Sequence, residues 1–154
     1  MTRTRWVRLG LAVLAVQGAV LGVWAGFAPR SFYDDFPGFD RMWVAPDGPY
    51  NEHLVRDVGE LNLALAFVTL AAVVWCTPLL VRLVAGAWLV EGLPHLVYHL
   101  RHLDPLASDA KVSSIAGLAI VPVIALVLLA MATDRGRSGA MADQSASRSS
   151  ASSG

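Results

Sequence analysis

Residues Leu61–Leu93, "LNLALAFVTLAAVVWCTPLLVRLVAGAWLVEGL", hold two long apolar runs separated only by "CTP". Each run belongs to a block of about 20 apolar residues, the length that a helix needs to cross a hydrocarbon core about 30 Å thick. Thr77 can cap a helix N-terminus, and proline is favoured in a first helical turn, where Pro78 stands. The stretch therefore predicts two membrane-spanning helices joined by a very short turn, which makes them an antiparallel hairpin.

Two further apolar blocks flank this hairpin, and together the four predicted spans cover about residues 9–28, 58–76, 79–100 and 112–132. Only 16% of the 154 residues are charged, against roughly 25% in soluble domains. We therefore expect an all-α polytopic protein whose residues 1–133 form a compact left-handed bundle of four transmembrane helices, with the lipid bilayer as its main partner. A net charge of zero does not attract nucleic acid, and a single cysteine excludes an internal disulfide.

The connections and termini complete the predicted topology. Residues 29–57 are rich in proline, glycine and aromatic side chains, which predicts turns at the membrane–water interface and no regular element. The first block is longer than the core of a signal peptide, so we expect it to remain as the first span. Arg3, Arg5 and Arg8 precede it without an acidic residue, which indicates a multi-pass protein of the cell (inner) membrane with both termini cytoplasmic. The Ser/Ala/Gly-rich residues 134–154 predict a disordered cytoplasmic tail.

Three glycines in the first span, Gly18, Gly22 and Gly26, recur at four-residue spacing. They lie on one face of the helix and allow another backbone to approach closely. The partner on that face is either another span of the same chain or, in a homodimer or a complex with another membrane protein, a second chain.

Ionisable residues form a stripe on the third span. At about 100° per residue, its four members fall within roughly 80° of one another; they are Glu91, His95, His99 and His102. Pro94 lies within the stripe and cannot donate a hydrogen bond to the carbonyl of Val90, which predicts a kink beside Glu91. Charged groups at membrane depth are costly and usually face the interior of a bundle.

A second stripe opens the second span and consists of His53, Asp57 and Glu60. Because the two spans are antiparallel, the start of one and the end of the other lie in the same leaflet. We therefore expect the two stripes to converge in the outer leaflet, with Glu60 acting as one unit with Glu91, His95 and His99.

Several functions for this convergent site remain open. It could be a structural network in which carboxylates accept hydrogen bonds from histidines and from Arg56. It could bind a transition metal through Glu91, His95, His99 and Glu60, in a metal-binding protein or an oxidoreductase subunit, because histidines at i and i+4 can share one ion.

Glu/His chains also suit a proton or ion pathway. Haem ligation would require histidines on facing helices, and His53 is the only histidine outside the third span. Ser113 and Ser114 lie in no nucleophile motif, so the sequence assigns no catalytic residue and leaves enzyme activity undecided.

Three motifs carry a resemblance to a known family. They are "FYDDFPG" at 32–38, "GPYNEHLVRDVGELNLAL" at 48–65 and "PHLVYHLRHLD" at 94–104. With these motifs, about residues 9–132 resemble a family of small, four-helix integral membrane proteins of actinobacterial type, whose function is unknown. The resemblance implies the four-span topology and brings no reaction with it.

Overall fold

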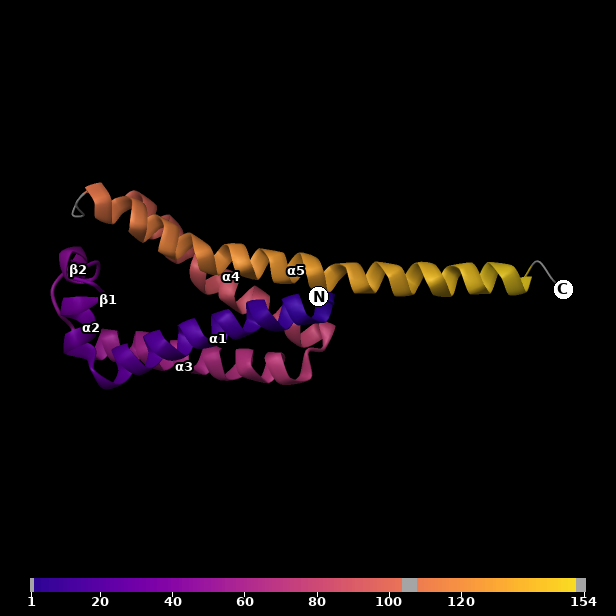
Figure 1. Cartoon of the computed structure of the whole chain (residues 1–154), viewed down its shortest axis with the longest axis horizontal. Helices are drawn as coiled ribbons and strands as arrows, with labels where there is room; N and C mark the ends of the chain where they lie inside the picture. Colours follow the sequence, from indigo (N-terminus) through magenta and orange to yellow (C-terminus); the bar gives the residue numbers. More distant parts are fainter. Residues whose placement is uncertain (1, 104–107, 152–154) are drawn as a thin grey trace.

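The computed structural model describes residues 2–103 and 108–151, and for 108–110 and 133–151 it describes the backbone alone. Its elements are α1 (Arg3–Phe27), α2 (Pro29–Asp35), β1 (Pro37–Gly38), β2 (Arg41–Met42), the 3₁₀ helix η1 (Ala45–Asp47), α3 (Glu52–Trp75), α4 (Pro78–Arg101) and α5 (Ser108–Ala151) (Figure 1). Four helical segments are long and apolar enough to cross a membrane: Arg3–Phe27, Glu52–Trp75, Pro78–Arg101 and Lys111–Ala132. The prediction of an all-α membrane protein with four spans is confirmed.

The helix ends follow from their capping residues. The side chain of Asn51 accepts a hydrogen bond from the backbone N–H of Leu54 at 3.3 Å, so α3 begins above its apolar core. The hydroxyl of Thr77 accepts one from the N–H of Leu80 at 3.3 Å, and Pro78 opens α4. Between the two helices, Cys76 adopts a left-handed conformation with φ 47°, which turns the chain within two residues.

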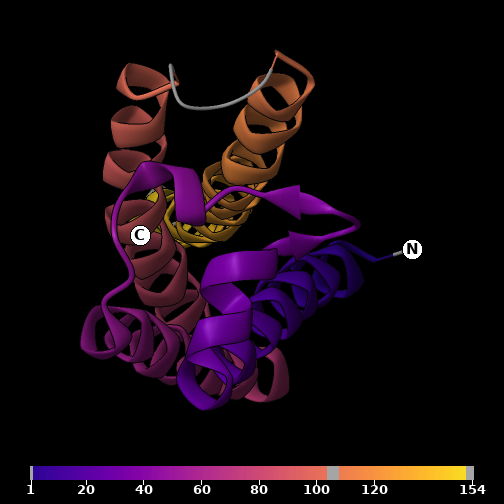
Figure 2. The ribbon, with the colours of Figure 1, turned by 90° about the vertical axis from the view of Figure 1, so that its left-hand side faces the viewer.

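The four spans pack as two pairs. Helix α1 packs chiefly along α3 and α4 packs along α5, whereas α3 and α4 share far fewer contacts in spite of their short link. Figure 2 shows α4 and α5 on one side, α1 and α3 on the other, and the segment with β1, β2 and η1 lying across the space between them. The hairpin expected from the sequence is therefore made over only part of its length, because α4 packs chiefly along α5.

Small residues explain the close contact of α1 with α3. A Cβ atom added to Gly22 would lie 2.9 Å from the carbonyl oxygen of Gly59, and one added to Gly18 would lie 3.0 Å from the ring of Trp88. An added Cβ at Gly59 would meet the backbone of Gly26. Gly18 and Gly22 of α1 are thus covered within the chain, whereas no described atom lies within 4 Å of a Cβ added to Gly26, and a partner chain on this face stays a prediction.

The core lies in the half of the bundle near the α3–α4 link. Trp88 is fully buried at its centre, and its indole N–H donates to the hydroxyl of Thr69 at 2.9 Å. At the edge of this half, the guanidinium groups of Arg3 and Arg82 donate to the carbonyls of Met131 and Ala132. We call this part of the bundle the closed half, and its buried apolar residues are Val7, Leu11, Leu14, Ala72, Cys76, Val81, Val84, Ala85, Trp88, Ala125, Leu128 and Ala132.

One connection differs from the sequence-based expectation. Residues 29–35 form the helix α2 in place of turns, because Pro29 occupies a first helical turn and Arg30 pairs with Asp34 one turn later. The backbone of α5 is helical to Ala151, where a disordered tail was expected. The side chains of 133–151 lie outside the described part, so the disorder of the tail stays a prediction.

Candidate functional site

A cavity of about 580 Å³ lies where the two helix pairs part, next to the long loop. We call this region the open half. Its volume is within the range of small-molecule sites, about 300–1,000 Å³. The polar residues that line it are Gln17, Asp47, Asn62, Glu91, His95, His99 and Ser114. The apolar residues that line it are Val20, Leu21, Phe32, Phe36, Trp43, Val44, Leu54, Val55, Val58, Gly92, Gly117, Leu118 and Val121.

Both helices of the α4–α5 pair carry a proline near this cavity. Pro94 lies inside α4 and Pro122 inside α5, and each removes one backbone hydrogen bond from its helix. A Cβ added to Gly92 would lie 3.4 Å from the ring of Pro122, so the two helices remain close at that level. Helix-interior prolines favour bends, so both helices of this pair carry a preferred site for a bend.

Aromatic side chains form the loop-side wall. The rings of Phe32 and Phe36 lie 4.8 Å apart, and Phe36 meets the indole of Trp43 edge-on at 5.8 Å. Trp24 packs edge-on against both phenylalanines. The indole of Trp43 also lies against Gly117 of α5, since a Cβ there would be 3.4 Å from it. The loop is thereby packed onto both helix pairs.

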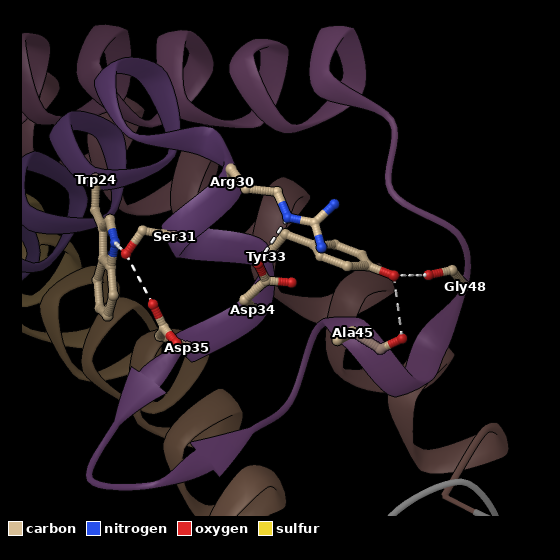
Figure 3. A network of polar contacts seen from close by, with 8 residues as sticks. All are labelled: Trp24, Arg30, Ser31, Tyr33, Asp34, Asp35, Ala45 and Gly48. Atoms are coloured by element: carbon tan, nitrogen blue, oxygen red, sulfur yellow. Dashed lines mark hydrogen bonds and ion pairs between the residues drawn. The ribbon is translucent and has the colours of Figure 1, made fainter.

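Polar contacts hold this loop in place (Figure 3). The hydroxyl of Tyr33 lies 2.5 Å from the carbonyl oxygen of Gly48 and 3.3 Å from that of Ala45, so it ties α2 to η1. Arg30 donates to the carboxylate of Asp34 at 2.6 Å, and this hydrogen bond raises the pKa of Arg30 above its ordinary value. The permanently charged guanidinium lies over the ring of Tyr50, 4.9 Å from its centre.

A second chain of contacts anchors α2 to α1. The indole N–H of Trp24 donates to the hydroxyl of Ser31 at 3.2 Å, and this hydroxyl donates to the carboxylate of Asp35 at 2.9 Å (Figure 3). Because α2 is fixed to α1 and η1 is fixed to α2, Asp47 at the end of η1 is held at the cavity.

The polar edge of the cavity comes from α4. Glu91, His95 and His99 lie one turn apart on one face, as the spacing predicts, and all three line the cavity. The imidazole rings of His95 and His99 are 4.7 Å apart and nearly perpendicular. Asp47 lies close enough to both imidazoles to interact with them electrostatically. Among the described residues, Glu91 has no hydrogen-bond or ion-pair partner.

Two other polar atoms of the lining residues are buried without a partner among the described residues. They are the side-chain oxygen Oε1 of Gln17 and the indole nitrogen Nε1 of Trp43. Buried polar groups are nearly always hydrogen-bonded, and each exception requires an explanation. Here both residues line the same cavity, so a bound molecule could supply the missing partners.

The second predicted stripe does not reach this cavity. Helix α3 presents Val58 and Asn62 to it, and Glu60, two residues from each, lies about 200° further round the helix. Glu60 is accordingly exposed on another face. His53 and Asp57 pair with each other at 3.5 Å, away from the cavity lining. The expected unit of Glu60 with Glu91 is therefore not assembled.

Two further members of the expected network also have other contacts. His102 lies at the end of α4, where its Nδ1 is 2.8 Å from the carbonyl oxygen of Tyr98. Arg56 pairs with Glu52 at 2.8 Å and donates to the carbonyl of Gly26 at 2.5 Å, so it joins α3 to α1. Neither of them lines the cavity.

The described residues contain no group of three His, Cys, Asp or Glu side chains placed to hold a metal ion. The metal site expected from Glu91, His95, His99 and Glu60 thus lacks its fourth member and a converging geometry. For haem, His53 would have to face the α4 histidines, and it does not line the cavity.

Several lining residues were missed by the sequence argument. Gln17 and Asn62 are polar residues inside apolar spans, and this alone could have identified them. Ser114 was considered only as a nucleophile, although it is almost fully buried in the cavity wall. Asp47 could not have been found, because only the folded loop brings it to the histidines.

Comparison with known proteins adds no relative: no family model, curated protein or solved structure matches this chain. The four apolar helices establish the class, a small four-span integral membrane protein. The resemblance to the actinobacterial-type family remains an expectation from the three motifs.

Proposed function

We propose that this membrane protein binds a small amphiphilic molecule in the cavity of the open half. The apolar body of the molecule would lie against the aromatic and aliphatic walls, and its polar head would meet the α4 edge of Glu91, His95 and His99. The observation that supports this function best is the two-sided lining of one cavity of about 580 Å³, since small-molecule sites combine apolar walls with a few polar groups.

A ligand site has more support than a purely structural network. In a network, the carboxylate of Glu91 would accept hydrogen bonds from the protein, and among the described residues it accepts none. A polar group removed from water without a partner is costly. A ligand head that donates to Glu91 would supply a partner that the described residues do not, and it would offset this cost for the buried side-chain oxygen of Gln17.

A proton pathway has less support for a different reason. Such a path would have to continue beyond Glu91 through the closed half. The described core there is apolar around Trp88, with the hydroxyl of Thr69 already bonded to the carbonyl of Leu65 at 2.6 Å. Among the described core and cavity residues, aspartate, glutamate and histidine side chains therefore line the open half alone.

The loop and the cavity belong to the outer leaflet in this proposal, with both termini cytoplasmic. Arg3, Arg5 and Arg8 support this orientation. In a Cys76→Ala background, single cysteines at Thr2 and Asp47 would be tested with a membrane-impermeant maleimide on intact cells. Labelling at Asp47 alone is expected, and labelling at Thr2 alone would reverse the orientation.

Binding is testable with a neutral amphiphile, decan-1-ol. The protein would be labelled with 5-fluorotryptophan and placed in zwitterionic lipid nanodiscs, and the ¹⁹F resonance of Trp43 would be assigned with Trp43→Phe. We expect that resonance to shift saturably with decan-1-ol, while the resonance of Trp75, which is exposed on α3, shifts only in proportion to the amount added. A Trp43 shift that is equally unsaturable would contradict the proposal.

Variants that fill the cavity provide the control. Val58→Phe and Gly117→Leu add bulk from opposite walls and are expected to abolish the saturable shift. The matched variants Leu61→Phe on α3 and Gly86→Leu on α4 place the same bulk where space is open, and they should bind like the parent. Two filling variants guard against the chance that one of them fails to fold.

A further inference from the structure

The charges that line the cavity have one sign. Asp47 and Glu91 contribute two carboxylates, and no lysine or arginine among the described residues lines the cavity. Arg30 of α2 pairs with Asp34, and Arg56 of α3 pairs with Glu52. Histidine is mostly neutral at pH 7, where His95 and His99 act as hydrogen-bonding groups without a balancing charge.

The unpartnered atoms of the lining are mainly acceptors. Among the described residues, the carboxylate of Glu91 has no donor, the buried Oε1 of Gln17 has none, and the buried indole N–H of Trp43 has no acceptor. An ammonium group has several N–H donors and no acceptor. A carboxylate or phosphate head would instead meet two like charges and leave these acceptors without partners.

The aromatic wall fits the same chemistry. Phe36 and Trp43 meet edge-on at 5.8 Å on the loop side of the cavity. Cations are attracted to the faces of aromatic rings, most strongly to that of tryptophan. A cationic head in the cavity would thus have carboxylates and aromatic rings among the groups that line the same space.

We infer that the cavity selects a cationic amphiphile, specifically a primary or secondary ammonium head on an apolar body, through Glu91 and Asp47. This inference rests on the proposed function, because it names the class of ligand for the same cavity. Asp47 is exposed on the loop, and Glu91 is half-buried on α4, about two helical turns before His99. The two carboxylates therefore mark an outer and an inner position for a bound ammonium head.

Three probes with the same chain length test the charge preference. Decylammonium, decan-1-ol and decanoate would be titrated against the Trp43 resonance in zwitterionic nanodiscs, with concentrations corrected for partitioning into empty nanodiscs. Decylammonium is expected to bind at least about tenfold more tightly than decan-1-ol, which corresponds to about 1.4 kcal/mol, and decanoate is expected to bind most weakly.

Two glutamine variants assign the preference to a residue. Glu91→Gln should reduce decylammonium affinity about tenfold and decan-1-ol affinity far less, since a neutral head loses no ion pair and keeps a hydrogen bond to the amide. Glu60→Gln removes a glutamate of α3 that does not line the cavity, so it should change neither affinity.

The outcomes separate the two proposals. Equal binding of decylammonium and decan-1-ol, or tightest binding of decanoate, would overturn the cationic preference while cavity binding stands. Saturable binding of none of the three probes would overturn the proposed function together with the preference. If decylammonium affinity drops as much in Glu60→Gln as in Glu91→Gln, the cationic preference through Glu91 is overturned. The effect would then come from the loss of any negative charge and not from the position of Glu91.

Discussion

The closed and open halves of this bundle are built from the same four helices, but the first is filled by side chains and the second contains a cavity. In the closed half, Trp88 fills the centre, and its single polar atom is bonded to Thr69. In the open half, the helix pairs part around a cavity whose polar lining includes Glu91 and Gln17, which have side-chain oxygens without partners among the described residues. The difference separates a tightly packed core from the cavity for which we propose ligand binding.

The largest loss of stability is expected from Trp88→Ala, which tests whether the closed half is the stable core. The change removes a fully buried indole that packs against Gly18, so we expect a loss of about 3–5 kcal/mol in the free energy of unfolding. The measurement is equilibrium or thermal unfolding in detergent. Trp75→Ala is the matched control, because Trp75 is 68% exposed and its loss should change little. Equal effects of the two changes would show that the closed half is not the stable core.

A smaller effect is expected from Gly59→Ala, which tests whether each helix pair stays closed beside the open half. The added Cβ would lie 2.7 Å from the Cα of Gly26, so the α1 and α3 backbones must move apart. We expect a destabilisation of about 1–3 kcal/mol. Gly86→Ala meets nothing within 4 Å and should be neutral or slightly stabilising in the same unfolding assay. If Gly59→Ala behaves in the same way, close packing of α1 on α3 is not needed.

Tyr33→Phe tests the loop that covers the cavity. It removes the hydroxyl that ties α2 to Gly48 and Ala45 and leaves the ring in place, so the expected loss of stability is about 0.5–1.5 kcal/mol. Limited proteolysis of the loop should become faster. Tyr98→Phe serves as the control because Tyr98 lies on α4, outside the loop. Unchanged proteolysis in Tyr33→Phe would mean that the hydroxyl does not hold the loop.

The smallest effect is expected for the coupling between Glu91 and Glu60, which the two sequence stripes predict to act as one unit. Glu91→Gln and Glu60→Gln should have additive effects on unfolding, within about 0.5 kcal/mol, because the two residues lie on different faces of different helices and share no partner. The double variant measures this directly. A clear departure from additivity would restore the convergent site that the stripes predict.

The spans could be predicted because membrane thickness dictates their length, and Asn51 and Thr77 marked two helix starts through ordinary capping chemistry. The pairing of helices could not, because it depends on which small residues meet. Gly22 meets Gly59, and that contact sets the rotation of α3 and turns Glu60 away from the cavity. The stripe of Glu91, His95, His99 and His102 follows from helical periodicity alone; the first three residues line the cavity and His102 does not.

The arginines at the end of the closed half affect how the molecule is positioned along the membrane normal. Arg3 and Arg82 reach the carbonyls of Met131 and Ala132, and Arg8 reaches that of Val74 at 3.3 Å. At the opposite end, Arg30 and Asp34 are fixed beside Tyr50. Charged groups held at both ends resist entering hydrocarbon, so the protein is matched to one bilayer thickness. In a thicker or thinner membrane the lipid would have to deform around the protein. The chain therefore prefers membranes of one thickness, and this preference does not depend on a bound ligand.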